Sequence, residues 1–454
     1  MYCEVCPLNT VCHTQLSFAN LESKAVVATF DGGKITSDGG CLLLREIDER
    51  VGVIDSIHQA LVDPRDPAKI RHHQSDLLRQ RVLAIALGYE DCNDHDTLRF
   101  DPALKTAVGR APDSAADLAS QPTFSRLENR VDARQLVRLS RQLMEGYIAA
   151  HPGDRKLIVL DVDSTDDATH GRQQMSLFHG YYDQHMYHPL VVFDGVDGYP
   201  LAAVLRPGNA HAAKGAVGIL RNLIRRLQKA YPNATVLVRA DGGFASPAIY
   251  RLLERLHVRY TIGLITNDRL KDHVADLIAE TAHAHAASGE KQRAFTSFRY
   301  RAGSWDTSRR VIAKVEQLAK GANTRFVVTN LRFETPQQVY DGLYVGRGDA
   351  ENRIKELKLH LKADRTSCHR FAANQFRLLL HTFAFVLLWH LRQAADGTEL
   401  ATATFETLRL RLLKIGARVQ ETVRRIVLHM ASSYPYQRLF AAVAANIQAM
   451  PLRL

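Results

Sequence analysis

Four side chains in one short segment have the types and the spacing of a phosphodiester-binding site. Tyr344 is followed by Arg347, Glu351 and Lys358, at offsets of three, seven and fourteen residues. At about 100° per residue, these positions share one stripe of a helix. The carboxylate could hold a hard divalent metal while the two cations neutralise phosphate oxygens. The same stripe could also be a solvated helix face with an Arg347–Glu351 ion pair, which would contribute only about 0.3 kcal/mol.

Two further carboxylate positions lie upstream, each at the end of an apolar run typical of a buried strand. Asp161 and Asp163 end one run, and Asp241 ends another. Residues two apart on a strand point to the same face, so either Asp161 or Asp163 could supply a first carboxylate. An Asp at a strand end is also a common turn residue. If the elements converge, Asp163, Asp241 and Glu351 could bind two Mg²⁺ ions that act on a phosphodiester, with Mn²⁺ as a substitute.

The composition describes a folded, basic chain. Of its 454 residues, 46% are hydrophobic, which is ordinary for a globular protein and excludes an intrinsically disordered one. The formal net charge of +11 indicates an anionic partner, with nucleic acid as the leading candidate and an anionic membrane surface as the lesser one. Six cysteines in a chain of this length do not make a disulfide framework and fit a reducing cytoplasm. The first residues lack the basic and apolar segments of a signal peptide, so we expect none.

Apolar periodicity changes along the chain and places the carboxylates on different kinds of element. Helical spacing fills residues 41–150, and short β-rich runs alternate with helices over 156–267. Three strands follow over 293–331 without a helix between them. From residue 337 the pattern is almost wholly helical. The apolar run over 376–391 is interrupted by polar side chains and is too short to span a membrane, so we expect a buried helix.

Several segments, in the same order, resemble the DDE transposases of bacterial insertion sequences. The resemblance rests on the Tyr-Arg-Glu-Lys signature described above, on Asp-Ser-Thr at 163–165 and on Arg-Ala-Asp at 239–241. Three further segments are similar to the insertion-sequence family numbered 1380: the Gly-rich stretch 30–40, Phe-His-Gly-Tyr-Tyr at 178–182 and Leu-Arg-Pro-Gly-Asn at 205–209. The resemblance runs from about residue 28 to about residue 430.

The resemblance implies a fold and a division into regions. The implied fold is α/β, a ribonuclease H-like mixed sheet with helices on both faces, a β-rich insertion, and helical N- and C-terminal regions. The expected regions are a mainly helical part that binds DNA ends (1–150), the first part of the catalytic core (151–267), the β-rich insertion (268–332), the second part of the core (333–395) and a helical C-terminal part that pairs protomers (396–454).

The resemblance also implies an activity. Asp163, Asp241 and Glu351 match the catalytic, metal-binding residues of the family, with Asp161 as the alternative first Asp. Two Mg²⁺ ions would serve cleavage at terminal inverted repeats and transfer of the 3′-hydroxyl ends into target DNA. The implied partner is double-stranded DNA, on which the protein would assemble as a homodimer. We therefore expect a cytoplasmic, nucleoid-associated bacterial protein without a membrane partner.

The signature residues are the first candidates for DNA contacts, because they match family residues that engage phosphates near the cleaved end. Two further basic residues are added as candidates, one two positions before Asp241 and one within the signature segment. The predicted DNA-binding residues are Tyr344, Arg347, Lys358, Arg239 and Lys355. Trp305, in the predicted insertion, could contact a displaced base or could be a packing residue.

Other interpretations of the same residues remain open. Asp161-x-Asp163-x-Thr165 also looks like the nucleophile motif of haloacid dehalogenase-type phosphatases, although the later strand offers only Asp241 followed by two glycines. A catalytically idle, transposase-derived DNA-binding protein would keep the basic helices and need none of the carboxylates. Two groups could in principle ligate zinc, but their spacing is poor, so we expect reduced thiols and structural histidines. These groups are Cys3, Cys6, Cys12 and His13, and His185 with His188.

Overall fold

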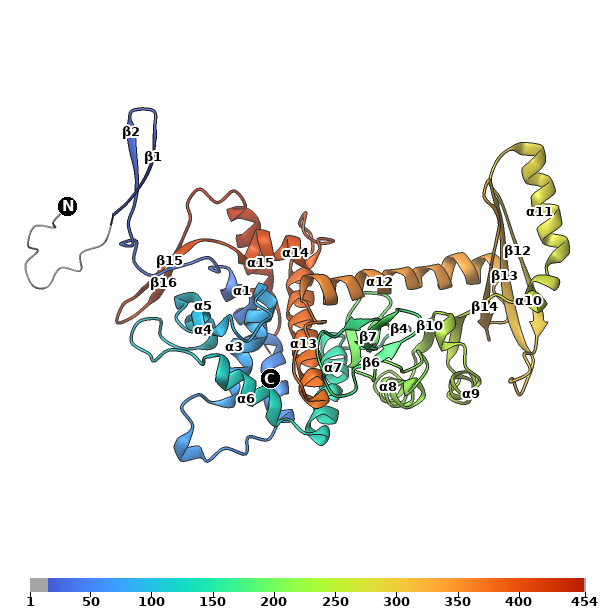
Figure 1. Cartoon of the computed structure of the whole chain (residues 1–454), viewed down its shortest axis with the longest axis horizontal. Coiled ribbons are helices and arrows are strands. Elements are labelled where there is room, and N and C mark those ends of the chain that lie inside the picture. Colours follow the sequence, from blue (N-terminus) through green and yellow to red (C-terminus); the bar gives the residue numbers. More distant parts are fainter. Residues whose placement is uncertain (1–14, 453–454) are drawn as a thin grey trace, which may run out of the picture.

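An eight-stranded mixed sheet forms the centre of the computed structural model, which describes residues 15–452 (Figure 1). The order of strands across the sheet is β12-β13-β14-β11-β10-β4-β8-β9. The strands are β4 (Leu157–Ser164), β8 (Leu190–Asp194), β9 (Pro200–Val204), β10 (Thr235–Ala240), β11 (Arg259–Leu264), β12 (Gln292–Tyr300), β13 (Arg309–Leu318) and β14 (Gly321–Thr329).

The strands that carry the predicted carboxylates are neighbours. β10 lies between β4 and β11 and is parallel to both, whereas β8 runs antiparallel to β4. Val162 of β4 pairs with Ala240 of β10. Asp163 follows Val162 in β4, and Asp241 directly follows β10. Because parallel strands end at the same edge of a sheet, the two carboxylates lie side by side there.

Helices cover both faces of the sheet, which agrees with the expected α/β class. Every residue of β8 is buried, and β10 is buried after its first residue. Helices α8 (Ala216–Ala230) and α9 (Pro247–Arg255) lie on one side of the sheet, and α12 (Gly348–Lys355) crosses the other (Figure 1). α7 (Ala133–Ala150) and α13 (Phe371–Ala394) pack against β9. Strands covered on both faces contain continuous apolar runs, which is why they were recognisable in the sequence.

The long apolar helix predicted in the second half of the chain is α13. Its length and composition would suit a membrane span, but nearly all of its residues are buried inside the protein. It packs against α1, α3 and β9, between the N-terminal helices and the sheet. The prediction of a buried helix is confirmed.

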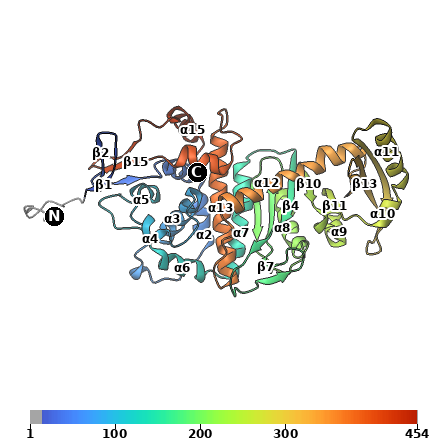
Figure 2. The same ribbon diagram turned by 45° about the horizontal axis from the view of Figure 1, so that its top comes forward.

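The N-terminal region is mainly helical, as expected. Its further elements are α1 (Cys41–Val51), α2 (Val53–Ala60), η1 (Pro67–Lys69), α3 (Gln74–Leu87), α4 (His95–Leu98), α5 (Pro102–Val108) and α6 (Gln121–Arg130). A hairpin of β1 (Leu16–Leu21) and β2 (Lys24–Ala28) precedes them. All residues of these two strands are exposed, and the hairpin projects from the body of the protein (Figures 1 and 2).

The predicted insertion contains three antiparallel strands, but they extend the central sheet instead of forming a sheet of their own. β14 pairs with β11, and β13 and β12 continue outward from it. Two helices, α10 (Asp268–Asp272) and α11 (Ala275–Ser288), connect β11 to β12, and α11 packs on β12 and β13. The pairing of β14 with β11 joins segments far apart in the sequence, so local periodicity could not reveal it.

The C-terminal region differs from the almost wholly helical expectation. After α14 (Phe405–Leu408) and η6 (Arg409–Leu413), the chain forms a hairpin of β15 (Ala417–Glu421) and β16 (Ile426–Met430), and then α15 (Gln437–Ala449). β15 also pairs with β3 (Ile35–Thr36) near the start of the chain. Ala417 and Val419 are buried while Arg418 between them is exposed, the alternation of a strand with one covered face.

Candidate catalytic site

The structure brings Asp163, Asp241 and Glu351 to a single cavity of about 410 Å³. Asp163 and Asp241 reach it from the neighbouring ends of β4 and β10, and Glu351 reaches it from α12, which crosses this edge of the sheet. The cavity is also lined by Ser164, Thr165, Tyr182, Arg347, Ile354, Lys355, Lys358 and Leu359. The convergence that the sequence left open is therefore present in the fold.

The signature residues lie on one helical run from residue 338 to residue 360, built from turns of different width. A wide π-type segment, η3 (Gln338–Tyr344), is followed by the tight turn η4 (Val345–Arg347), by α12 and by a second wide segment, η5 (Glu356–His360). The junction residues keep right-handed helical dihedral angles, so the axis continues through them. Departures from the regular α-helix of this kind are frequent at functional sites.

These wide and tight turns divide the predicted stripe between two adjoining cavities. Arg347, Glu351 and Lys358 line the first cavity, whereas Tyr344 lines a second one of about 600 Å³. Asp241 and Arg347 line both, so the two cavities share a wall. Helical spacing predicted the shared side of the helix correctly, but it did not predict this division.

Asp163 is largely buried and lies beside groups of both charges. Its side chain is only 11% exposed, and its Oδ1 accepts a hydrogen bond of 2.8 Å from the backbone amide of Ser164. Burial raises the pKa of Asp163 to about 6. The Arg347 charge opposes this rise in the pKa, while the neighbouring carboxylates of Asp241 and Glu351 add to it. A carboxyl group in this setting is stabilised in its charged form by a nearby cation.

A cation already lies between two of the carboxylates. The Arg347 guanidinium donates to Asp163 Oδ2 from Nη1 at 2.9 Å and to Glu351 Oε1 from Nη2 at 3.3 Å. The three candidate carboxylates do not form a cluster with all ligand atoms within 4.8 Å in the part of the chain that the structure describes. The Arg347 guanidinium thus lies between Asp163 and Glu351 and bridges them.

The two lysines that line the cavity, Lys358 and Lys355, differ in their contacts with carboxylates. Lys358 Nζ donates to the backbone oxygen and to Oδ1 of Asp166, both at 2.8 Å. Burial acts to raise the pKa of Asp166, but the hydrogen bond from Lys358 and its charge outweigh burial and lower that pKa. Lys355 is exposed and contacts no carboxylate among residues 15–452, so its ammonium group is available to an incoming anion.

Tyr344 approaches the backbone of β11 closely. A β-carbon at Gly263 would lie 2.6 Å from the Tyr344 hydroxyl, so only glycine leaves room for this ring. Burial raises the pKa of Tyr344, and the hydroxyl therefore keeps its proton at neutral pH. The group can donate a hydrogen bond into the cavity that it shares with Asp241.

Asp161 and Arg239 form a buried ion pair, which corrects two predictions. Arg239 Nε and Nη2 donate to the two oxygens of Asp161 at 2.6 and 2.7 Å, and Arg239 Nη1 donates to the Leu343 carbonyl oxygen. The two side chains are 8% and 1% exposed. Arg239 therefore ties two strands to the signature helix, and its buried guanidinium is engaged within the protein. Asp161 lies two residues before Asp163 in β4, further from the edge of the sheet, and the signature helix covers it. Asp163 and not Asp161 therefore lines the cavity.

Trp305 packs inside the protein, which is the second of the two roles that the sequence left open. It is 4% exposed, and its ring lies 5.3 Å from that of Tyr250 and 5.6 Å from that of Tyr300. The segment between β12 and β13 folds back, so the indole fills a gap beside α9. An indole enclosed by two aromatic rings has no free face for a base.

Trp305→Ala should therefore lower the free energy of unfolding by about 3–5 kcal/mol, because it removes a fully packed indole. DNA affinity per folded molecule should stay unchanged. Urea unfolding and a fluorescence anisotropy titration with duplex DNA, on the same preparation, measure the two quantities. Lost affinity at unchanged stability would restore the base-contact prediction.

One cavity residue, Tyr182, and one partner of a cavity residue, Asp166, were not singled out in the sequence. Tyr182 lies in the turn between β6 (Leu177–His179) and β7 (Gln184–Tyr187), in a small sheet with β5 (Asp167–Ala168). Asp166, the partner of Lys358, directly follows Thr165. Tyr182 falls inside the 178–182 segment that carries the family resemblance, which was the available signal. Asp166 had no signal beyond the run of polar residues after β4.

The possible zinc ligands do not assemble in the described residues. His188 is buried and contacts the Ala210 carbonyl oxygen through Nδ1 at 2.6 Å, as a structural histidine does. His185 is exposed and its ring packs against Phe178. The Cys3, Cys6, Cys12 and His13 group lies outside the described residues.

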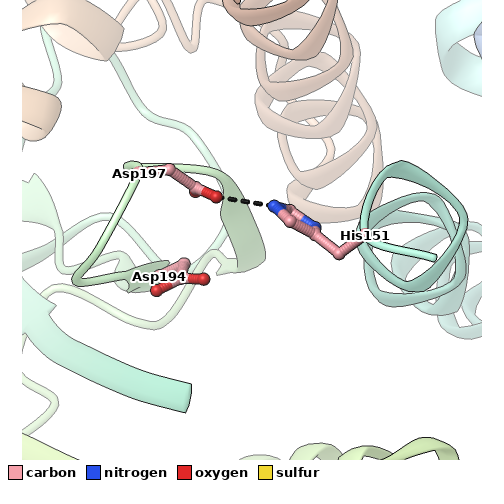
Figure 3. A group of neighbouring side chains, drawn as sticks. All are labelled: His151, Asp194 and Asp197. Carbon is pink, nitrogen blue, oxygen red and sulfur yellow. Dashed lines mark hydrogen bonds and ion pairs between the residues drawn. The ribbon is translucent and has the colours of Figure 1, made fainter. Parts of the chain in front are cut away.

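A separate cluster of His151, Asp194 and Asp197 has its ligand atoms within 4.8 Å of one another (Figure 3). His151 Nε2 lies 2.6 Å from Asp197 Oδ2, and its Nδ1 lies 2.7 Å from the Tyr147 carbonyl oxygen. Asp194 Oδ2 accepts a hydrogen bond of 2.6 Å from the Tyr147 hydroxyl and pairs with Arg155 at 3.3 Å. Donors of the protein thus satisfy these carboxylates, and we assign the cluster to packing of α7 against the turn between β8 and β9.

A comparison with families of known proteins covers nearly all of the residues that the structure describes. A family model described as Transposase DDE domain group 1 matches residues 18–452, which is nearly the whole chain. A search of curated proteins found no match.

Proposed function

The chain belongs to the Transposase DDE domain group 1 family, and on this premise we propose that it is the DNA transposase of an insertion sequence. It would cut DNA at terminal inverted repeats and transfer the 3′-hydroxyl ends into target DNA. The observation that carries the proposal is the convergence of Asp163, Asp241 and Glu351 on one cavity lined by cations. Segments 30–40, 178–182 and 205–209 lead us to propose the insertion-sequence family numbered 1380 as its group.

The donor set of the cavity fits divalent metal ions. Carboxylate oxygens are the protein ligands that Mg²⁺ and Mn²⁺ favour, and the position of the Arg347 guanidinium marks a place for positive charge between two of them. We propose Asp163, Asp241 and Glu351 as the ligands of two such ions. When bound, the ions would lower the pKa of the attacking water or 3′-hydroxyl and neutralise the charge on the leaving oxygen.

The side chains around the carboxylates would bind and orient the DNA. Lys355 is exposed and would contact a phosphate directly. Arg347 and Lys358 would exchange their carboxylate partners for phosphate oxygens, which suit a guanidinium fork and an ammonium group. The protonated Tyr344 hydroxyl would donate a hydrogen bond to a neighbouring phosphate. We also propose that protomers pair as a homodimer on DNA.

The proposed function predicts strongly salt-dependent binding to duplex DNA and no hydrolysis of a small aryl phosphate. Several phosphate contacts release counterions, so the logarithm of the affinity should fall linearly with the logarithm of the salt concentration. Anisotropy titrations at several salt concentrations and a p-nitrophenyl phosphate assay measure the two properties. Phosphatase turnover that disappears in Asp161→Asn would instead support a haloacid dehalogenase-type enzyme.

Cleavage separates the transposase from an idle DNA-binding protein. A plasmid carrying the gene with its flanking inverted repeats, incubated with the protein and Mg²⁺, should be cut at the repeat ends. Salt-dependent binding without cutting, in Mg²⁺ and in Mn²⁺, would contradict the enzymatic proposal.

A further inference from the structure

A groove of about 860 Å³, separate from the two cavities described above, lies at the edge of the central sheet opposite the catalytic carboxylates. Its walls come from the end of α9, the start of β11, the connection of β12 to β13 and the segment after β14. β4, β10 and β11 are parallel, and the catalytic carboxylates lie where β4 and β10 end, so the start of β11 belongs to the other edge. Five arginines line this groove: Arg259, Arg299, Arg309, Arg310 and Arg332.

Only one of these arginines is neutralised by carboxylates. Arg309 donates to Glu254 at 2.8 Å and to Asp306 at 3.0 Å. Arg299 donates to a backbone carbonyl oxygen, that of Ser308, and keeps its full charge. Backbone oxygens therefore position this guanidinium without cancelling its charge.

Arg310 is held in the same way, while Arg259 and Arg332 are free. Arg310 donates to the carbonyl oxygens of Leu331 and Glu334 at 3.0 and 2.9 Å. Arg259 and Arg332 are exposed, and their side chains make no hydrogen bond or ion pair with any described residue. Five guanidinium groups thus face three carboxylates, those of Glu254, Asp306 and Glu334. Such an excess of fixed positive charge in a concave surface attracts a polyanion.

We propose that this groove binds the phosphate backbone of duplex DNA at a point away from the scissile bond. The inference rests on the proposed function for the class of partner, and on the groove itself for the site. Guanidinium groups match phosphate oxygens in a bidentate manner, and the exposed hydroxyls of Ser297 and Thr307 add donors. Contacts of this kind fix the position of the duplex without reading its sequence.

The length of β11 separates the two DNA contacts. Arg259 is its first residue, and Leu264, its last, lines the cavity that contains Tyr344. At roughly 3.4 Å per residue, five steps along the strand span about 17 Å. The phosphate at the catalytic carboxylates cannot also lie in the groove. The groove therefore holds a different stretch of DNA from the one that is cut.

The test compares two double variants that each remove two exposed, unpaired arginines. Arg259→Ala with Arg332→Ala removes the free groove charges, and Arg221→Ala with Arg225→Ala removes the same charge from the exposed side of α8. Binding to a random-sequence duplex of about 40 base pairs is measured without metal at several salt concentrations. We expect the groove variant to bind several-fold more weakly, with a salt slope smaller by about two, and the α8 variant to match the wild type.

Two results would overturn the inference. An unchanged slope in the groove variant would mean that the groove does not contact DNA, and equal losses in both variants would mean a general effect of net charge. Thermal midpoints of all proteins check that folding is intact. Because binding is measured without metal, failure of the groove is distinguishable from failure of the proposed function, which shows in wild-type cleavage.

Discussion

Asp163→Ala, Asp241→Ala and Glu351→Ala are each expected to reduce strand cleavage by roughly a thousandfold or more, because each removes a carboxylate from the proposed metal site. DNA affinity should remain within a few-fold of the wild type, since phosphate contacts with cations supply most of it. Single-turnover cleavage of a labelled duplex carrying a terminal repeat, in Mg²⁺ and in Mn²⁺, measures the first quantity. Anisotropy titration of the same duplex measures the second.

The chain offers a matched control on the same helix. Asp349 is an exposed carboxylate two residues before Glu351 and does not line the cavity, so Asp349→Ala should cleave normally. Asp161→Ala should behave differently from both, because it leaves the buried Arg239 charge without its partner and lowers stability by about 3–5 kcal/mol. Normal cleavage by Asp241→Ala or Glu351→Ala would show that these carboxylates do not hold the metal.

Arg347→Gln is expected to bind Mn²⁺ about tenfold or more tightly than the wild type when DNA is absent. In the wild type, a metal ion must displace two charge-assisted hydrogen bonds, from Arg347 to Asp163 and to Glu351, and the largely buried one to Asp163 is of the order of 1.5–3 kcal/mol. The same variant should bind DNA more weakly and with a salt slope smaller by about one, because it loses a phosphate contact. Isothermal titration calorimetry with Mn²⁺ and anisotropy with duplex DNA measure the opposite effects.

The pH of these titrations must be high enough to ionise the Asp163 carboxyl group. Arg347 lowers the pKa of Asp163, so its removal would raise that pKa above its present value of about 6. Metal binding requires the ionised carboxylate, and the titrations are therefore performed near pH 8, well above the wild-type pKa of about 6. Lys355→Gln is the control, because it removes one positive charge from the same cavity without freeing a ligand. Equal gains in both variants would mean a general charge effect, and a loss in Arg347→Gln would mean that the guanidinium does not occupy the metal position.

Features with local causes could be predicted from the sequence. The spacing of Tyr344, Arg347, Glu351 and Lys358 placed them on one side of a helix, because the helical repeat depends only on neighbouring residues. The apolar runs before Asp163 and Asp241 marked buried strands for the same reason, as did the three strands of the insertion. The buried helix α13 was recognisable from its composition.

The Leu-Arg-Pro-Gly-Asn motif at 205–209 was also recognisable in the sequence, but the structural reason for its glycine was not. A side chain at Gly208 would place its β-carbon 2.0 Å from the carbonyl oxygen of Met186 and 2.2 Å from that of Leu177. Only glycine allows the backbone to pass so close to the small sheet that carries Tyr182. The segments in contact are far apart in the chain, so the sequence shows the glycine but not the close approach that requires it.

The sequence by itself determined the elements and the residue types of the site, and the tertiary structure decided which residues do what. Asp161 and Asp163 have the same side chain on the same strand face, yet one is buried against Arg239 and the other lines the cavity. Trp305 is packed against Tyr250, and the β15–β16 hairpin is joined to the start of the chain through the pairing of β15 with β3. Burial and choice of partner arise from contacts between segments far apart in the chain, whereas periodicity reports only on neighbouring residues. Residues of one type and one local pattern can therefore differ in role according to what the fold packs against them.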